Sequence, residues 1–151
     1  MAKKKKKVLN PRVPRTHNGG TMTSSEWHGK IISSLRQLSR WYIPPRQAKL
    51  EARRLKPKSV VGRHIYEYKC ASCGKYFKDS DIAIDHIKET DGLKSYADLP
   101  RFCERLFCDK EGYQILCNKD VTKGIKNCHY VKTQKYMKDR RDLKKGGAND
   151  E

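Results

Sequence analysis

Apolar residues in the front third of the chain recur at helical spacing. The series consists of Trp27, Ile31, Leu35, Leu38 and Tyr42. Ahead of it, the segment Thr23–Glu26 offers an N-cap. Pro44 and Pro45 end this helix, and Pro45 suits the first turn of a second helix that runs through Lys56. The pattern therefore predicts a helical pair over residues 24–58.

Shorter apolar runs follow from residue 59 onward. Three of them have the length and composition of strands, at 60–69, 81–87 and 113–117. Residues 99–107 suit a helix, and Asn127 is placed to cap a last helix from Cys128 to about Leu143. The polar residues 88–95 contain the turn-forming pair Asp91-Gly92. Short strands mixed with helices predict an α+β fold, with residues 59–143 as its main domain.

Charge separates the front of the chain from the back. The 151 residues carry a net charge of +18, and residues 1–69 hold 18 Lys and Arg against 3 acidic residues. Residues 1–23 lack hydrophobic periodicity, so we expect a disordered basic arm, and we expect a frayed tail at 144–151. Such a footprint favours nucleic acid as the partner.

The same analysis excludes a membrane-spanning or secreted protein. No apolar run approaches the roughly 20 residues of a membrane-spanning helix. The lysine-rich start has no apolar region behind it, so it is not a secretory signal. We therefore expect a cytoplasmic protein without a membrane partner.

Basic side chains are predicted on the outer faces of the helical pair. We expect DNA phosphate contacts there, although a solvated face has the same composition. These residues are Lys30, Arg36, Arg40, Arg46, Lys49, Arg53 and Arg54.

Six cysteines in a chain without a secretory signal indicate metal rather than disulfides. Cys70-x-x-Cys73 has the spacing of half a zinc site. The other half is Cys117 with Cys128, which we favour because one ends a strand and the other starts a helix; Cys103 with Cys108 is the alternative. Buried or free thiols without metal are a further possibility. Zinc would add the folding energy that a small core lacks.

Asp85 and His86 are the candidate catalytic pair. A carboxylate is a hard oxygen ligand for a divalent cation, and an imidazole can take a proton from water near neutral pH. An Asp-His dipeptide alone is more often found at an ordinary surface position than in a functional site. Its weight comes from the Cys-x-x-Cys before it and from the downstream segment Cys128-His129-x-x-Lys132-Thr133.

Four ordered blocks together resemble the HNH endonucleases, in particular the small phage-type members. The blocks are Tyr68–Gly74, Ile84–Ile87, Phe107–Cys117 and Cys128–Thr133. The likeness spans about residues 63–137 and extends upstream to the Trp-bearing helix followed by Pro-Pro-Arg.

The resemblance implies a ββα-metal fold braced by zinc at Cys70, Cys73, Cys117 and Cys128. It also implies that Asp85 and His129 hold one catalytic divalent cation, Mg, Mn or Ni, with His86 as general base. Lys132 either neutralises a phosphate or lies in solvent. The implied activity is DNA cleavage, by nicking or double-strand cutting, to a 5′-phosphate and a 3′-hydroxyl. Phage genome processing or packaging beside a terminase, in the host cytoplasm, follows from the resemblance alone.

Two features depart from the family pattern. Ten residues separate Cys117 from Cys128 where the family usually has two, which we interpret as a longer loop. Gly112 stands where the motif's middle Asn is usual, and Asn118 and Asn127 are the nearest candidates. The alternative function is a non-catalytic, zinc-stabilised nucleic-acid-binding protein. A regulatory protein that retains only the HNH shape is a third.

Overall fold

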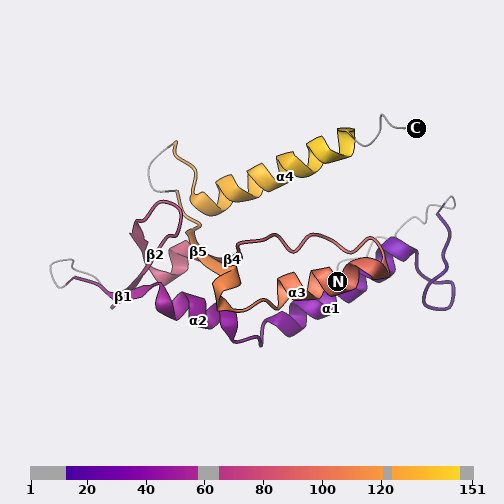
Figure 1. Ribbon diagram of the computed structural model, residues 1–151, viewed down its shortest axis with the longest axis horizontal. Helices are drawn as coiled ribbons and strands as arrows, with labels where there is room; N and C mark the ends of the chain where they lie inside the picture. The colour runs from indigo at the N-terminus through magenta and orange to yellow at the C-terminus, as the bar shows by residue number, and fades with distance from the viewer. Residues whose placement is uncertain (1–12, 58–64, 121–123, 147–151) are drawn as a thin grey trace, which may run out of the picture. The chain divides into compact units, whose positions relative to one another are not determined.

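The computed structural model describes residues 13–57, 65–120 and 124–146, which are drawn in colour in Figure 1. The chain divides into two compact units. The first unit comprises residues 1–41 and 90–106, and the second comprises 42–89 and 107–151. This division differs from the consecutive segments 24–58 and 59–143 expected from the sequence. The α+β class is confirmed.

The described part of the first unit is helical and has an ordered turn ahead of its first helix. His17 and Met22 pair through two backbone hydrogen bonds of 3.1 Å, with Asn18, Gly19 and Gly20 at positive φ between them. Composition predicted disorder throughout residues 1–23. For 17–22 the structure differs, because Asn-Gly-Gly adopts the positive φ angles of a tight turn at little cost. Residues 1–12 of the predicted arm lie outside the described residues.

Helix α1 (Ser24–Ser39) starts where the sequence predicted. Thr23 accepts a hydrogen bond from the Glu26 backbone N–H at 3.2 Å, and the Glu26 carboxylate accepts one from the Thr23 N–H at 3.1 Å, a complete capping box. Helix α3 (Leu99–Leu106) belongs to the same unit and buries Phe102 and Leu106. The predicted helices over these two segments are confirmed.

In the second unit, the predicted helix 45–56 is only partly correct. Helix α2 (Pro44–Glu51) has prolines in its first turn, but the chain leaves the helix at Ala52 and forms β1 (Arg53–Leu55). Strand β1 pairs antiparallel with β2 (Tyr66–Lys69), which pairs with β3 (Tyr76–Phe77). Pairing with β2 satisfies backbone groups that a longer helix would have satisfied internally, so tertiary contact overrides helix propensity here. Residues 58–64, which include part of the strand predicted at 60–69, lie outside the described residues.

A second, two-stranded sheet forms the middle of this unit. Strands β4 (Ile82–His86) and β5 (Tyr113–Cys117) are antiparallel, with Ile82 opposite Cys117 and His86 opposite Tyr113. Helix α4 (Cys128–Gly146) follows β5. The predicted strands 81–87 and 113–117 and the helix starting at Cys128 are confirmed. This helix extends to Gly146, and the rest of the predicted tail, residues 147–151, lies outside the described residues.

The core of the second unit lies along β5. One buried group comprises Tyr68, Ile82 and Ile115, and another comprises Cys70, Leu116 and Cys117. Cys70 and Cys117 are fully buried, so two of the predicted metal ligands are themselves core residues. Within the described residues, none of the helices combines the length and hydropathy needed to span a bilayer.

Candidate metal centre

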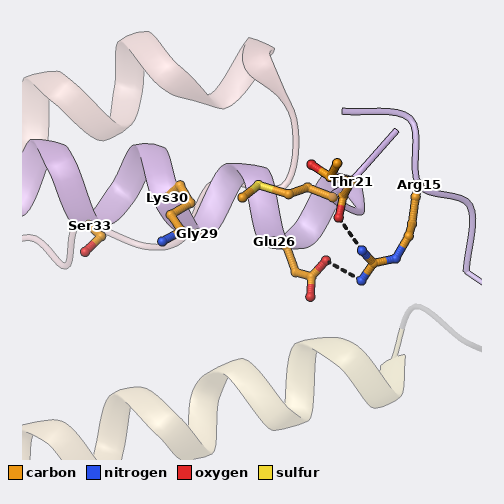
Figure 2. A pocket seen from close by; sticks show the side chains of 7 residues that line it. Arg15, Thr21, Glu26, Gly29, Lys30 and Ser33 are labelled. Atoms are coloured by element: carbon orange, nitrogen blue, oxygen red, sulfur yellow. Dashed lines mark hydrogen bonds and ion pairs between the residues drawn. The ribbon is translucent and has the colours of Figure 1, made fainter. Parts of the chain in front are cut away.

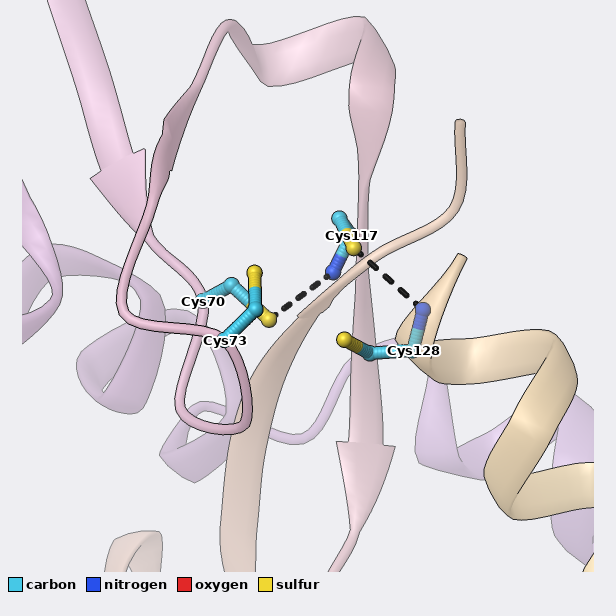
Figure 3. Close-up of side chains that lie close together, drawn as sticks. All are labelled: Cys70, Cys73, Cys117 and Cys128. Atoms are coloured by element: carbon cyan, nitrogen blue, oxygen red, sulfur yellow. Dashed lines mark hydrogen bonds between the residues drawn. The ribbon is translucent and has the colours of Figure 1, made fainter. Parts of the chain in front are cut away.

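Four cysteines from separate segments of the second unit converge at one point (Figure 3). Cys70 follows β2, Cys73 lies in the next turn, Cys117 ends β5 and Cys128 begins α4. Their sulfur atoms all lie within 4.8 Å of one another. Tetrahedral zinc with Zn–S bonds of about 2.3 Å holds its sulfurs about 3.8 Å apart, so a small contraction would complete the site. The predicted ligand set is therefore brought together as a cluster suited to zinc.

Local backbone structure aims the first pair of sulfurs. The turn after β2 closes through hydrogen bonds from the Gly74 N–H to the Cys70 carbonyl, at 3.0 Å, and from the Cys70 N–H to the Lys75 carbonyl, at 2.9 Å. Gly74 has a φ of 70°, which glycine adopts without strain. The Cys-x-x-Cys segment is thus a tight turn with both thiols on its inner side, as Figure 3 shows.

Backbone N–H groups also point at the sulfurs. The Cys117 N–H donates to Cys70 Sγ at 3.4 Å, and the Cys128 N–H donates to Cys117 Sγ at 3.3 Å (Figure 3). Such donors favour the thiolate form of a cysteine, which is the form that binds metal. These backbone N–H groups therefore place partial positive charge beside sulfur atoms that would be negatively charged when they bind a metal.

The thiol pKa values reflect burial and these donors. Burial raises the pKa of the Cys117 thiol to about 12 and also raises the pKa of Cys73. Burial acts in the same direction on Cys70, but the backbone N–H groups around its sulfur, led by those of Cys73 and Cys117, outweigh it and lower its pKa to about 7. Zinc binding at these cysteines would thus release protons, and zinc affinity would fall with falling pH.

The ten-residue connection between Cys117 and Cys128 is closed by Asp120. Its carboxylate accepts hydrogen bonds from the backbone N–H and the side-chain amide of Asn127, each at 2.9 Å, and from Lys126 at 3.3 Å. Asn127 in turn caps α4, because its side-chain oxygen accepts the Tyr130 N–H at 2.8 Å. This clasp holds the start of α4, and with it Cys128, beside Cys117.

The remaining cysteines stand outside the cluster. Cys103 is half-buried on α3 of the first unit, and Cys108 precedes β5; all six cysteines are free thiols in the structure. A Cβ added at Gly112 would lie 2.9 Å from Cys108 Cβ, closer than real Cβ contacts. A side chain such as Asn therefore cannot occupy position 112 unless Cys108 moves.

The two alternative asparagines have structural roles away from Asp85. Asn118 donates from its side chain to the Ile82 carbonyl at 3.2 Å, at the opposite end of the β4–β5 pair from His86. Asn127 caps α4. The amide that does reach Asp85 is Gln114, which stands opposite it in the strand register and donates to Asp85 Oδ2 at 3.4 Å. Sequence reasoning missed Gln114, because only the register reveals its position.

Asp85 and His86 lie at the end of β4, as predicted. Both are half-buried, and the His86 ring packs against Tyr113 with 4.6 Å between ring centres. His129 is half-buried in the first turn of α4, one turn before Lys132, whose ammonium lies 2.6 Å from Asp85 Oδ2. Residues three positions apart are neighbours on the surface of an α-helix, so His129 and Lys132 lie on the same face of α4.

These residues do not form a second ready cluster of ligands. In residues 13–57, 65–120 and 124–146, the four cysteines are the only set of three or more His, Cys, Asp or Glu side chains with all ligand atoms within 4.8 Å of one another. Asp85 instead contacts Lys132 and Gln114.

The predicted DNA-binding residues are divided between the two units. Lys30 and Arg36 are exposed on α1 of the first unit, and Arg40 is exposed directly after its end, where two shallow pockets follow the helix. Figure 2 shows the pocket that Lys30 lines, in which Arg15 is paired with Glu26 at 3.4 Å. This basic face of α1 is open to solvent.

The other arginines belong to the second unit. Arg46 is exposed on α2. The guanidinium of Arg53 lies 4.2 Å from the ring centre of Tyr66, and that of Arg54 lies 3.2 Å from the ring centre of Tyr76. Both arginines of β1 thus lie over tyrosine rings, and Arg54 is also paired with Glu67 at 2.8 Å.

Comparison with known proteins adds no assignment. No protein-family model matches the chain, and no curated protein or solved structure is significantly similar to it.

Proposed function

We propose that this protein is a metal-dependent DNA endonuclease of the HNH type. The observation that carries the proposal is the contact between Lys132 on α4 and Asp85 at the end of β4. It joins the first turns of α4 to the strand that bears Asp85 and His86, and β5 lies alongside as the partner of β4. The order strand, strand, helix and the placing of the acidic and imidazole groups agree with a ββα-metal core.

The cysteine cluster supports this arrangement, because two of its members lie on β5 and α4. Cys117 ends β5 and Cys128 begins α4, so a zinc ion held there would fix the helix relative to the strand. His129 immediately follows Cys128, and its position would therefore be set by the zinc site. Catalytic groups supported by a rigid neighbouring site keep the precise geometry that catalysis needs.

The fit of a divalent cation depends on Asp85 and His129. Carboxylate oxygen and imidazole nitrogen are ligands that Mg, Mn or Ni accept, and the Asp85 carboxylate already holds a cationic group, the Lys132 ammonium. When bound, the cation would supply charge stabilisation to the phosphate and to the leaving oxygen. We assign Asp85 and His129 as the residues that would hold it.

His86 is the proposed general base. It would accept a proton from the attacking water through an imidazole that is half-buried against Tyr113. Gln114, opposite Asp85, would keep that carboxylate oriented by donating to Oδ2. Cleavage of the bond between phosphorus and the 3′ oxygen then leaves a 5′-phosphate and a 3′-hydroxyl.

Basic residues of both units would hold the DNA by its phosphates. The residues proposed are Lys30, Arg36, Arg40, Arg46, Arg53 and Arg54, with Lys132 at the catalytic end. Such contacts position a duplex but carry no sequence information. A role in phage genome processing beside a terminase rests on the family resemblance alone.

One observation favours a second candidate, a zinc-stabilised nucleic-acid-binding protein without activity. Among the described residues, Asp85, His86 and His129 do not form a compact set of metal ligands. A binding protein would need the cysteine cluster and the basic surface but none of these three residues.

A plasmid-nicking assay separates the candidates. The zinc-loaded wild type, His86→Ala and the control His17→Ala are each incubated with supercoiled plasmid and Mg²⁺, Mn²⁺ or Ni²⁺. We expect nicking by the wild type and by His17→Ala, and a loss of at least about a hundredfold for His86→Ala. Equal nicking by all three, or none with any of the metals, would reject the nuclease while DNA binding by gel shift would still support the binding protein.

A further inference from the structure

The Lys132 ammonium lies among three oxygen atoms of the β4 end. It is 2.6 Å from Asp85 Oδ2 and 3.1 Å from Glu89 Oε1, and it also donates to the His86 carbonyl oxygen. The three charged side chains are 17–31% exposed, so this is a partly buried arrangement rather than a surface pair. The sequence pattern did not predict a role for Glu89.

The chemistry of this arrangement is that of a filled cation site. An ammonium has three N–H donors, which matches the three oxygens around it. Two carboxylates and a backbone carbonyl are also the oxygen types that hard divalent cations select. A divalent cation bound at Asp85 Oδ2 would repel the ammonium on the same oxygen, and this repulsion, which is strong in a partly buried site, favours displacement of Lys132.

We infer that Lys132 is an internal counter-ion that neutralises Asp85 in the absence of metal and that a divalent cation must displace it. The inference rests on the proposed function in that it takes Asp85 as the ligand of that cation. The ammonium released from Asp85 remains on α4, one turn from His129, where it can pair with a phosphate oxygen of the DNA. Lys132 is thus a positioning residue that competes with the metal before it assists substrate binding.

Metal affinity provides a direct test that requires no activity. The zinc-loaded full-length protein is titrated with MnCl₂ by calorimetry, as wild type, as Lys132→Met and as the control Lys135→Met, one turn further along α4 and exposed. Removing the competing ammonium should tighten Mn²⁺ binding by about tenfold or more, since a charge-assisted hydrogen bond of this kind is worth at least that factor in an equilibrium constant. Lys135→Met should bind like the wild type.

Equal or weaker Mn²⁺ binding by Lys132→Met would overturn the inference, as would the absence of binding in both proteins. If Lys132→Met does not fold, the wild type alone provides the test. Brief acetylation followed by mass spectrometry should show Lys132 becoming several times more reactive when Mn²⁺ is added, because its amine leaves the carboxylates, while Lys135 stays unchanged. Unchanged reactivity of Lys132 would refute displacement.

The two proposals fail in different ways. If Mn²⁺ displaces Lys132 but no variant nicks DNA, the nuclease is rejected and the counter-ion role stands. If the wild type nicks DNA while Lys132→Met binds Mn²⁺ no more tightly, the counter-ion role is rejected and the nuclease stands.

Discussion

Cys70→Ser tests the metal centre most directly, because Cys70 is fully buried and belongs both to the sulfur cluster and to the core. The substitution removes one of four sulfur ligands and leaves the volume of the side chain nearly unchanged. It also deprives the Cys117 N–H of its sulfur acceptor. We expect the variant to lose tight zinc binding and to melt at a much lower temperature.

The size of the effect follows from the share of one ligand. Structural zinc bound by four ligands contributes about 10–16 kcal/mol, so an equal share for each sulfur is about 2.5–4 kcal/mol. A whole domain is stable by only about 5–15 kcal/mol. In a domain of 60–100 residues, 1 kcal/mol changes Tm by about 4–8 °C, which predicts a decrease of about 10–32 °C.

The measurement combines zinc content with thermal unfolding. Wild type and variant are dialysed against buffer without metal, their zinc is quantified with a colorimetric chelator, and unfolding is followed by circular dichroism. Cys103→Ser is the matched control, because Cys103 lies on α3 of the first unit and outside the cluster. If Cys70→Ser retained one zinc per chain and the Tm of the wild type, the assignment of the cluster as a structural zinc site would be wrong.

Two further predictions concern the same unit. Asp120→Asn should speed zinc release, because it weakens the hydrogen bonds that hold Asn127. These hydrogen bonds from Asn127 keep the pKa of Asp120 below its usual value. The variant should therefore be less stable than the wild type at neutral pH, and this difference should vanish as pH falls through that lowered pKa. A constant difference down to strongly acidic pH would contradict this role. Leu116→Ala, at a side chain only 2% exposed, should cost about 2–5 kcal/mol in chemical denaturation, whereas Leu143→Ala, 77% exposed, should stay within about 0.5 kcal/mol. An equal loss in the free energy of unfolding for both variants would show that Leu116 is not part of the core.

Local features of this chain could be predicted because their causes lie within a few residues. Thr23 and Glu26 satisfy each other's backbone groups at the start of α1, and the Cys70-x-x-Cys73 spacing makes its own turn around Gly74. The short apolar strand β5 and the capping side chain of Asn127 are equally local. Each of these was predicted from sequence and is confirmed.

Other features depend on segments that are distant in sequence. Residues 53–55 leave the predicted helix because β2 offers them hydrogen-bond partners, and no property of these residues announces that strand. Gln114 meets Asp85 only through the register of β4 and β5. Glu89 meets Lys132 only because α4 returns to the end of β4.

By itself, the sequence determined the capped helices, the strands around the cysteines and the Cys-x-x-Cys turn, because short-range hydrogen bonding and residue spacing leave few alternatives. The tertiary structure alone decided which cation Asp85 holds. That outcome depends on how closely an ammonium from α4 approaches two carboxylates 43 and 47 positions earlier in the chain. Electrostatic energy at such contacts changes with ångström displacements, which residue types and their spacing do not specify.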